Sequence, residues 1–213
     1  NFLLKQIKLN RDSQILDIGC GRGKILGFLS TRLNLRYKPK GIDVEIHKDR
    51  DKRINFTKID AISYLKNNKK NFDLILIKQT IHFLNFREIK KLIFLCKSRL
   101  KKKGKILIFT LVTSKNEIPT FLLMKRRLKI SLSRDKKIIK YLSKLNPKSK
   151  KKIFSFKVKI LRKKYIEMIK KRYISVLLNL STSQILKGID EIKDKFKKKL
   201  IFNDKLICLI IDK

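Results

Sequence analysis

Tryptophan is absent from this sequence, and alanine, histidine, proline and cysteine are rare. The 213 residues include one alanine, two histidines, three prolines and three cysteines. Cys20, Cys96 and Cys208 are odd in number and far apart, which excludes a disulfide framework and the paired cysteines of a zinc site. We therefore expect a protein of a reducing, cytoplasmic compartment, without a metal site.

Long apolar runs are missing as well. No stretch approaches the roughly 18 apolar residues of a membrane-spanning helix, and no charged start leads into a short apolar core with a cleavage site. We expect no association with a membrane. With 43% hydrophobic residues, the 213 residues suit one α/β domain that carries an insertion.

Acidic residues are few: 17 Asp and Glu face 57 Lys and Arg, which gives a formal charge of +40. Such an excess usually favours nucleic acid as a partner, because basic side chains neutralise phosphates. However, 44 of the 57 basic residues are lysines, and a single alanine stands beside abundant Ile, Asn and Phe. This composition is typical of a genome rich in A and T codons, so the charge is weak evidence for an RNA substrate.

The most informative stretch is Gln14–Lys24, where an apolar segment runs into three glycines spaced two apart. It predicts a buried strand, a tight loop and then a helix. A dinucleotide-binding loop would need glycine or alanine at Lys24 or Leu26, and a phosphate-binding loop would need glycine at Ile18 and Ser or Thr at Ile25. Both kinds of loop are therefore excluded.

Asp43 follows the next apolar segment, 26 residues after Asp17. In nucleotide-binding α/β folds an acidic residue about twenty residues further on binds the ribose hydroxyls, and a carboxylate can accept from both of them. The alternative for Asp43 is a helix cap, and Glu45 is a second candidate for the ribose.

The segment Leu16–Gly23 resembles the first motif, D/E-x-G-x-G-x-G, of class I S-adenosylmethionine-dependent methyltransferases. The resemblance implies that this loop binds S-adenosylmethionine, that Asp43 holds the ribose, and that Asp60 and Ala61 lie near the adenine. Asp60 alone is equally typical of a helix N-cap. The residues that the resemblance assigns to the cofactor are Asp17, Gly19, Cys20, Gly21, Gly23, Asp43, Val44, Asp60, Ala61 and Lys78.

The loop Lys78–Leu84 follows an apolar run and ends in His-x-Leu, as in many small-molecule members of this family. His82 is a candidate for orienting a substrate or acting as a base, with a structural role as the alternative. Lys78 and Gln79 do not match the Asn/Asp-Pro-Pro-aromatic loop of amino-group methylating enzymes, which disfavours methylation of DNA adenine or of glutamine side chains.

Strand and helix patterns alternate up to residue 112, which predicts a Rossmann-like, doubly wound, mostly parallel α/β sheet of seven strands. We expect residues 1–112 to form the cofactor-binding half of a single domain. Residues 113–180 would form a helical insertion, acting as a lid, and a substrate-side segment, and 181–213 a last helix and an antiparallel hairpin. The expected strands are 14–18, 38–44, 54–59, 72–77 and 105–112. Two insertion helices are expected at 119–130 and 133–145, an extended segment at 154–161, a helix at 163–171, and a hairpin of 200–202 with 205–211 around a turn at 203–204.

Arg172 and Tyr173 resemble an arginine–aromatic pair of methyltransferases similar to trans-aconitate methyltransferase. This resemblance implies that they bind a carboxylate, for which an arginine fork is suited. The alternative is a surface arginine beside a core tyrosine. We predict methyl transfer to a small molecule that carries a carboxylate. An RNA methyltransferase with a basic insertion, and a non-catalytic module that binds the cofactor, are the other hypotheses.

Overall fold

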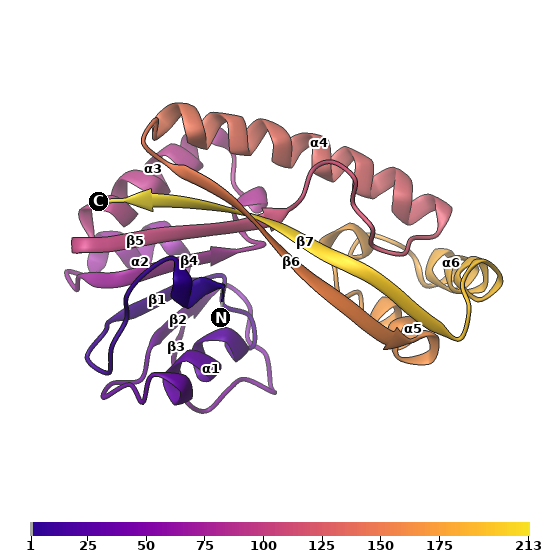
Figure 1. Cartoon of the computed structure of the whole chain (residues 1–213), viewed down its shortest axis with the longest axis horizontal. Helices are drawn as coiled ribbons and strands as arrows, with labels where there is room; N and C mark the ends of the chain where they lie inside the picture. The colour runs from indigo at the N-terminus through magenta and orange to yellow at the C-terminus, as the bar shows by residue number, and fades with distance from the viewer. Residues whose placement is uncertain (1) are drawn as a thin grey trace. The chain divides into compact units, whose positions relative to one another are not determined.

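A seven-stranded sheet in the order β3-β2-β1-β4-β5-β7-β6 is the centre of the computed structural model, which describes residues 2–213 (Figure 1). The sheet is mostly parallel, and its β5-β7-β6 side is antiparallel. The strands are β1 Ile15–Ile18, β2 Lys40–Asp43, β3 Asn55–Lys58, β4 Phe72–Lys78, β5 Leu100–Leu111, β6 Lys150–Leu161 and β7 Lys199–Asp212. The helices are α1 Lys24–Arg32, α2 Ala61–Asn67, α3 Phe86–Ser98, α4 Leu122–Leu145, α5 Arg162–Lys170 and α6 Thr182–Lys195.

The chain divides into two compact units. Unit 1 contains the residues up to Thr110 together with Ile138–Lys152 and Ile207–Lys213, and unit 2 contains Leu111–Lys137 and Ile153–Leu206. Short 3₁₀ helices lie at Leu3–Lys5 and Ile81–Phe83 in unit 1 and at Ser175–Leu177 in unit 2. No helix among residues 2–213 is long and apolar enough to cross a membrane.

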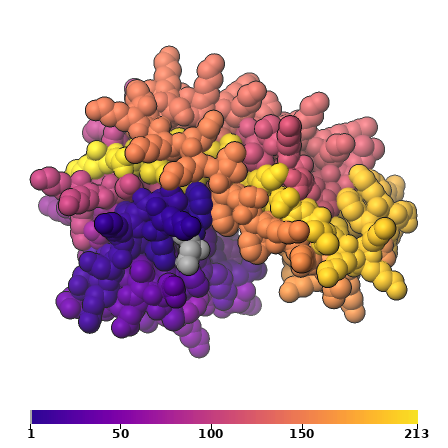
Figure 2. All heavy atoms as spheres, in the orientation of Figure 1, coloured from indigo at the N-terminus to yellow at the C-terminus, as the bar shows by residue number. Residues whose placement is uncertain are grey.

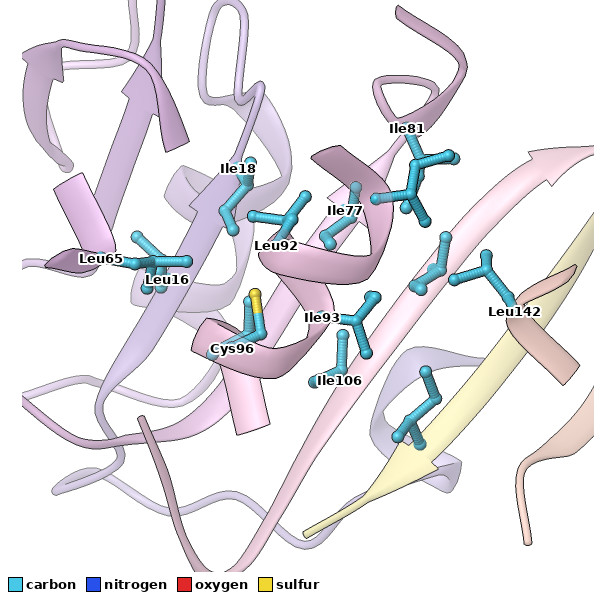
Figure 3. Packing of buried hydrophobic residues seen from close by; sticks show 14 of the residues in the cluster. Leu16, Ile18, Leu65, Ile77, Ile81, Leu92, Ile93, Cys96, Ile106 and Leu142 are labelled. Atoms are coloured by element: carbon cyan, nitrogen blue, oxygen red, sulfur yellow. The ribbon is translucent and has the colours of Figure 1, made fainter. Parts of the chain in front are cut away.

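Unit 1 is built on the parallel strands β1 to β5. All four residues of β1 and most of β4 are buried, as expected for parallel strands that are covered on both faces. Helix α3 begins at a capping box formed by Asn85 and Glu88. Its side chains Leu92, Ile93 and Cys96 point into the core of this unit (Figure 3). Burial of each large apolar side chain stabilises the fold by about 1.5 to 3 kcal/mol.

Unit 2 has a core of its own, to which α5 and α6 contribute. Helix α6 begins at a capping box, in which the Ser181 hydroxyl accepts from the Gln184 N–H. The buried side of α6 includes Gly188, whose added Cβ would lie 2.5 Å from the ring of Phe121. The fully or nearly buried residues of this core include Phe121, Met124, Tyr165, Ile169, Leu177, Leu180, Ile185, Ile189, Ile192 and Leu200.

The prediction of two helices at 119–130 and 133–145 was wrong, because α4 runs without a break from Leu122 to Leu145. The predicted break between residues 130 and 133 contains Ser131, but no proline or glycine interrupts α4. Buried positions at Leu128, Asp135 and Ile138 continue one face of the helix through this serine. A serine alone costs a helix too little to end it.

The antiparallel strands also differ from the prediction in their limits. No turn lies at Asn203 and Asp204, because β7 is continuous. It lies between β5 and β6 in the sheet, and β6 starts at Lys150. Glu117 accepts from the backbone N–H and side-chain amide of Asn203, which holds Asn203 within the strand. Strand β6 is an edge strand of the sheet, and its side chains, in orange, lie on the surface in Figure 2.

Strand β5 begins at Leu100, five residues before the predicted start. Phe72 of β4 pairs with Leu100 of β5, and Leu74 pairs with Lys105, so the register shifts between these two pairs and β5 carries a bulge. Gly104 lies at this bulge, where an added Cβ would lie 2.8 Å from the carbonyl oxygen of Phe72. Residues 101–104, three lysines and a glycine, therefore belong to the strand.

Candidate cofactor site

The glycine loop follows β1 directly and has the backbone that its sequence predicts. Gly19, Gly21 and Gly23 have φ angles of 69°, 51° and 68°, in the left-handed region where a side chain is unfavourable. Gly23 is the residue before α1, so the loop leads from a buried strand into a helix. Every second residue from Gly19 to Gly23 has a left-handed backbone, which explains why glycine occurs at every second position of the loop.

Two of the three glycines also allow a close approach to other segments. An added Cβ at Gly19 would lie 2.1 Å from Oγ1 of Thr80, and one at Gly23 would lie 2.3 Å from Cδ1 of Ile54. At Gly21 the nearest atom would be Nε2 of His47, 3.9 Å away. Gly19 is therefore packed against the loop after β4, whereas Gly21 has open space beside it.

Asp43, at the end of β2, is bonded to this loop. Its Oδ2 accepts from the Gly21 N–H at 2.7 Å, and its Oδ1 accepts from the Glu45 N–H at 3.0 Å. The side chain remains half-exposed, so both oxygens retain lone pairs for further donors. The acidic residue and the glycine loop predicted for one ligand are thus adjacent.

Asp17 is a buried carboxyl group at the end of β1, with 3% exposure. Its Oδ1 has no hydrogen-bond partner among the described residues. Burial raises the pKa of Asp17 to about 8, the charge of Lys78 opposes this rise, and the charge of Asp43 adds to it. A buried carboxyl oxygen without a partner is costly, which indicates a site for a donor that the protein itself does not supply.

Cys20 lies inside the loop, but its thiol is not a nucleophile. Burial, together with the charges of Asp17 and Asp43, raises the pKa of this thiol to about 12. It therefore stays protonated at neutral pH. Val44, which is also predicted to contact the cofactor, directly follows β2 and is 56% exposed.

Asp60 and Lys78 are the remaining charged residues predicted to contact the cofactor, and they follow β3 and end β4, respectively. Asp60 is the N-cap of α2, where its carboxylate accepts from the Ser63 N–H at 2.9 Å and where this bonding lowers its pKa. Ala61 is the first residue of that helix. Lys78 ends β4, close enough to Asp17 for its charge to lower the pKa of that group. The strands β1, β2 and β4 are parallel, so Asp17, Asp43 and Lys78 share the carboxyl edge.

His82 lies in the 3₁₀ helix after β4 and is 5% exposed. Its ring centroid is 4.3 Å from that of Phe83, with the two rings tilted by 45°. A nearby residue that the sequence did not indicate is Thr80, whose hydroxyl donates to the Lys78 carbonyl at 3.1 Å. Its contact with Gly19 joins positions 61 residues apart, so no local pattern could have revealed it.

Arg172 and Tyr173 belong to unit 2, where they end α5. The Arg172 N–H donates to the Ile169 carbonyl and the Tyr173 N–H to the Met168 carbonyl, at 2.9 and 3.2 Å. This is the Schellman pattern, and Arg172 takes its left-handed position with a φ of 49°. The Arg172 guanidinium donates to the Leu180 carbonyl at 2.8 Å, and its Nε is buried without a hydrogen-bond partner among residues 2–213.

The hydroxyl of Tyr173 is 2.8 Å from that of Tyr165, which itself donates to the Pro119 carbonyl at 2.6 Å. Because Tyr165 has one hydroxyl hydrogen, Tyr173 is the donor of this pair. Both residues at the end of α5 therefore have structural contacts within unit 2. The acceptor-binding role predicted for Arg172 and Tyr173 stays a prediction, as does the lid role of the insertion.

Residues 15–104 match the family model described as a methyltransferase domain. No curated protein matches the chain in sequence. A protein from Anabaena variabilis, described as a methyltransferase of an antibiotic biosynthesis pathway, has a TM-score of 0.62 and 14% identity, over 98% of this chain and 94% of that chain. An S-adenosylmethionine-dependent methyltransferase from Archaeoglobus fulgidus has a TM-score of 0.55 and 22% identity, over 100% and 90%.

A third similar structure is phosphoethanolamine N-methyltransferase 2 of Haemonchus contortus, in complex with phosphomonomethylethanolamine and S-adenosylhomocysteine. Its TM-score is 0.54 at 17% identity, over 98% of this chain and 51% of that chain. At these identities the structural similarity establishes the fold. Residues 15–104 are therefore similar to a methyltransferase domain, and the chain has the fold of an S-adenosylmethionine-dependent methyltransferase of known structure.

Proposed function

We propose that this chain transfers the methyl group of S-adenosylmethionine to a small molecule that carries a carboxylate. The observation that carries the methyl-donor part is the convergence of Asp17, the glycine loop and Asp43 at one edge of the unit 1 sheet. When it is bound, S-adenosylmethionine supplies a methyl group that its sulfonium already activates. The protein therefore needs mainly to align donor and acceptor.

The residues at this edge fit the chemical groups of that cofactor. The unpartnered oxygen of buried Asp17 is complementary to an ammonium group, and Lys78 to a carboxylate. Asp43 offers two oxygens to a pair of ribose hydroxyls, as predicted from its spacing. Asp60 and Ala61, at the start of α2, would bind the adenine.

The acceptor chemistry proposed for this chain requires little from a general base, because a carboxylate is already a nucleophile at neutral pH. His82 would then orient the acceptor or keep a structural role rather than remove a proton. We test the proposal with purified protein, methyl-labelled S-adenosylmethionine, and small-molecule and RNA fractions of a lysate, followed by mass spectrometry. Label found in RNA alone would contradict it.

Binding of S-adenosylmethionine should release a proton from Asp17 near pH 7. The pKa of this carboxyl group is raised to about 8 in the free protein, so the group is mostly protonated there. A bound ammonium would favour the charged form and lower this pKa. Calorimetry in buffers of different ionisation enthalpy should detect this proton, and the Asp17→Asn variant should not release it.

The same group makes stability depend on pH. Because its folded-state pKa is raised above the ordinary value of 3.8, the free protein should lose stability as the pH rises from about 4 to about 8. Asp17→Asn should remove this contribution, so its unfolding temperature relative to the parent should increase across that interval. A constant difference between the two proteins would contradict the assigned protonation.

For the acceptor we propose that the Arg172 guanidinium binds the carboxylate. Arg172→Gly should keep the left-handed helix end at a φ of 49°, which glycine prefers, and lose the guanidinium. Arg172→Lys keeps the charge but loses the planar fork. We expect both variants to lower methyl transfer at least about tenfold, as for a lost charge-assisted hydrogen bond.

The neighbouring exposed cation provides the control for this test. Lys171→Gln removes one positive charge from the helix end and should leave the rate of methyl transfer within about twofold, as for an ordinary surface substitution. Unfolding temperatures separate a binding effect from a structural one. If Arg172→Gly transferred methyl groups at the parent rate, the carboxylate part of the proposal would be wrong.

A further inference from the structure

A cavity of about 400 Å³ lies wholly within unit 2, between α4 and the segment that leads from β5 to α4. Its volume is in the range of small-molecule sites. The apolar part of the lining includes Ile118, Leu128 and Leu132. The polar part includes the side chains of Thr113, Thr120, Ser133, Lys125, Lys129 and Lys136. The cavity thus combines an apolar wall with positive charge and hydroxyl groups.

The three lysines form one stripe on α4. Lys125, Lys129 and Lys136 are four and seven residues apart, a spacing that places them on the same side of a helix. None of the three makes an ion pair or a hydrogen bond with its ammonium group within the described part of the chain. Three like charges on one helix side repel each other unless an anion lies between them.

No carboxylate lines the cavity. Glu117 and Asp135, which are close to lining residues in sequence, and Glu191, which contacts the start of α4, are already occupied or face elsewhere. Glu117 binds Lys205 and Asn203 in β7, and Glu191 accepts from the Leu122 N–H at 2.7 Å. Asp135 lies on the buried side of α4, where burial raises its pKa to about 6. The protein therefore leaves the charge of the lysine stripe without an internal counter-ion.

We propose that this cavity binds a small molecule through a phosphate monoester group. This inference goes beyond the proposed function, because the cavity is lined by none of the residues assigned to the cofactor or to the carboxylate. The lining contains lysines and hydroxyls but no arginine. Ammonium groups act as mobile point charges that surround a tetrahedral dianion, whereas planar carboxylates are better matched by an arginine fork. Hydroxyl donors from Thr120 and Ser133 would add hydrogen bonds to the phosphate oxygens.

The test compares two probes that share a ring and differ in their anion, phenyl phosphate and benzoate. Binding to the full chain is measured by calorimetry and by ligand-observed NMR at physiological salt. We expect phenyl phosphate to bind about tenfold more tightly than benzoate, because the dianion meets three cations. Equal affinities, or tighter binding of benzoate, would overturn the assignment to a phosphate.

A matched pair of double variants separates this cavity from the general positive charge of the chain. Lys129→Gln with Lys136→Gln should weaken phenyl phosphate binding about tenfold or more. Lys137→Gln with Lys140→Gln removes two equally exposed charges from α4 outside the cavity and should change it less than about twofold. Similar losses in both pairs would show non-specific attraction and overturn the inference.

S-adenosylmethionine binding, measured on the same proteins, tests the cofactor site separately from the cavity. Both double variants should bind the cofactor as the parent does, since all four lysines lie outside the residues assigned to it. If the parent bound phenyl phosphate specifically but not S-adenosylmethionine, the proposed function would fail while the cavity assignment stood. If it bound S-adenosylmethionine but not phenyl phosphate, this inference alone would fail.

Discussion

The Gly19→Ala variant is expected to lose about 2 to 5 kcal/mol of folding free energy and its affinity for S-adenosylmethionine. At a φ of 69°, a side chain costs about 1 to 2 kcal/mol. The added Cβ would also lie within 2.1 to 2.7 Å of three side-chain atoms of Thr80, and such overpacking typically costs about 1 to 3 kcal/mol. Chemical denaturation and calorimetry with the cofactor measure both effects.

Gly21→Ala is the matched control, because Gly21 has a similar backbone and open space around its Cβ position. Its φ is 51°, and its nearest neighbour would be 3.9 Å away. We expect a loss of about 1 to 2 kcal/mol, from backbone strain alone. Adding Thr80→Ala to Gly19→Ala removes two of the three close atoms and should restore part of the stability. Equal losses for the two single glycine variants would show that the approach of Thr80 is unimportant.

Asp43→Ala should weaken S-adenosylmethionine binding by about 1.5 to 3 kcal/mol, which is roughly 10-fold to 150-fold in Kd. The carboxylate would lose its charge-assisted bonds to the ribose, and the Gly21 N–H would lose its acceptor at 2.7 Å. Asp43→Asn keeps one acceptor oxygen for the loop and should have an intermediate Kd. Calorimetry on the purified variants gives both values.

Glu45 provides the control for Asp43, because it is the nearby acidic residue that spacing alone also allowed. Its side chain is exposed, and its backbone N–H, rather than its carboxylate, bonds to Asp43. Glu45→Ala should therefore change the affinity by less than about 0.5 kcal/mol. An unchanged affinity in Asp43→Ala would remove Asp43 from the site, and a large loss in Glu45→Ala would indicate that the ribose is bound there instead.

Residues whose role depends on their immediate neighbours were predicted well. The glycine loop and the buried strands β1 and β4 follow from spacing over a few residues. Asp60 shows a limit of this reasoning. Its N-cap bond to Ser63 joins residues three apart and can be predicted from the sequence, but its predicted contact with adenine depends on a ligand.

The sequence by itself determined the α/β fold class of this protein. The strand, the glycine loop and the acidic residue at the end of the next strand are short patterns, and the loop needs glycines because its backbone is left-handed. Tertiary structure decided which strands pair at the antiparallel edge, since β6 and β7 meet across α5 and α6. It also decided the approach of Thr80 to Gly19 and the left-handed position of Arg172. These features depend on contacts between residues far apart in the chain or on a helix end without glycine, and no periodicity of one segment encodes such contacts.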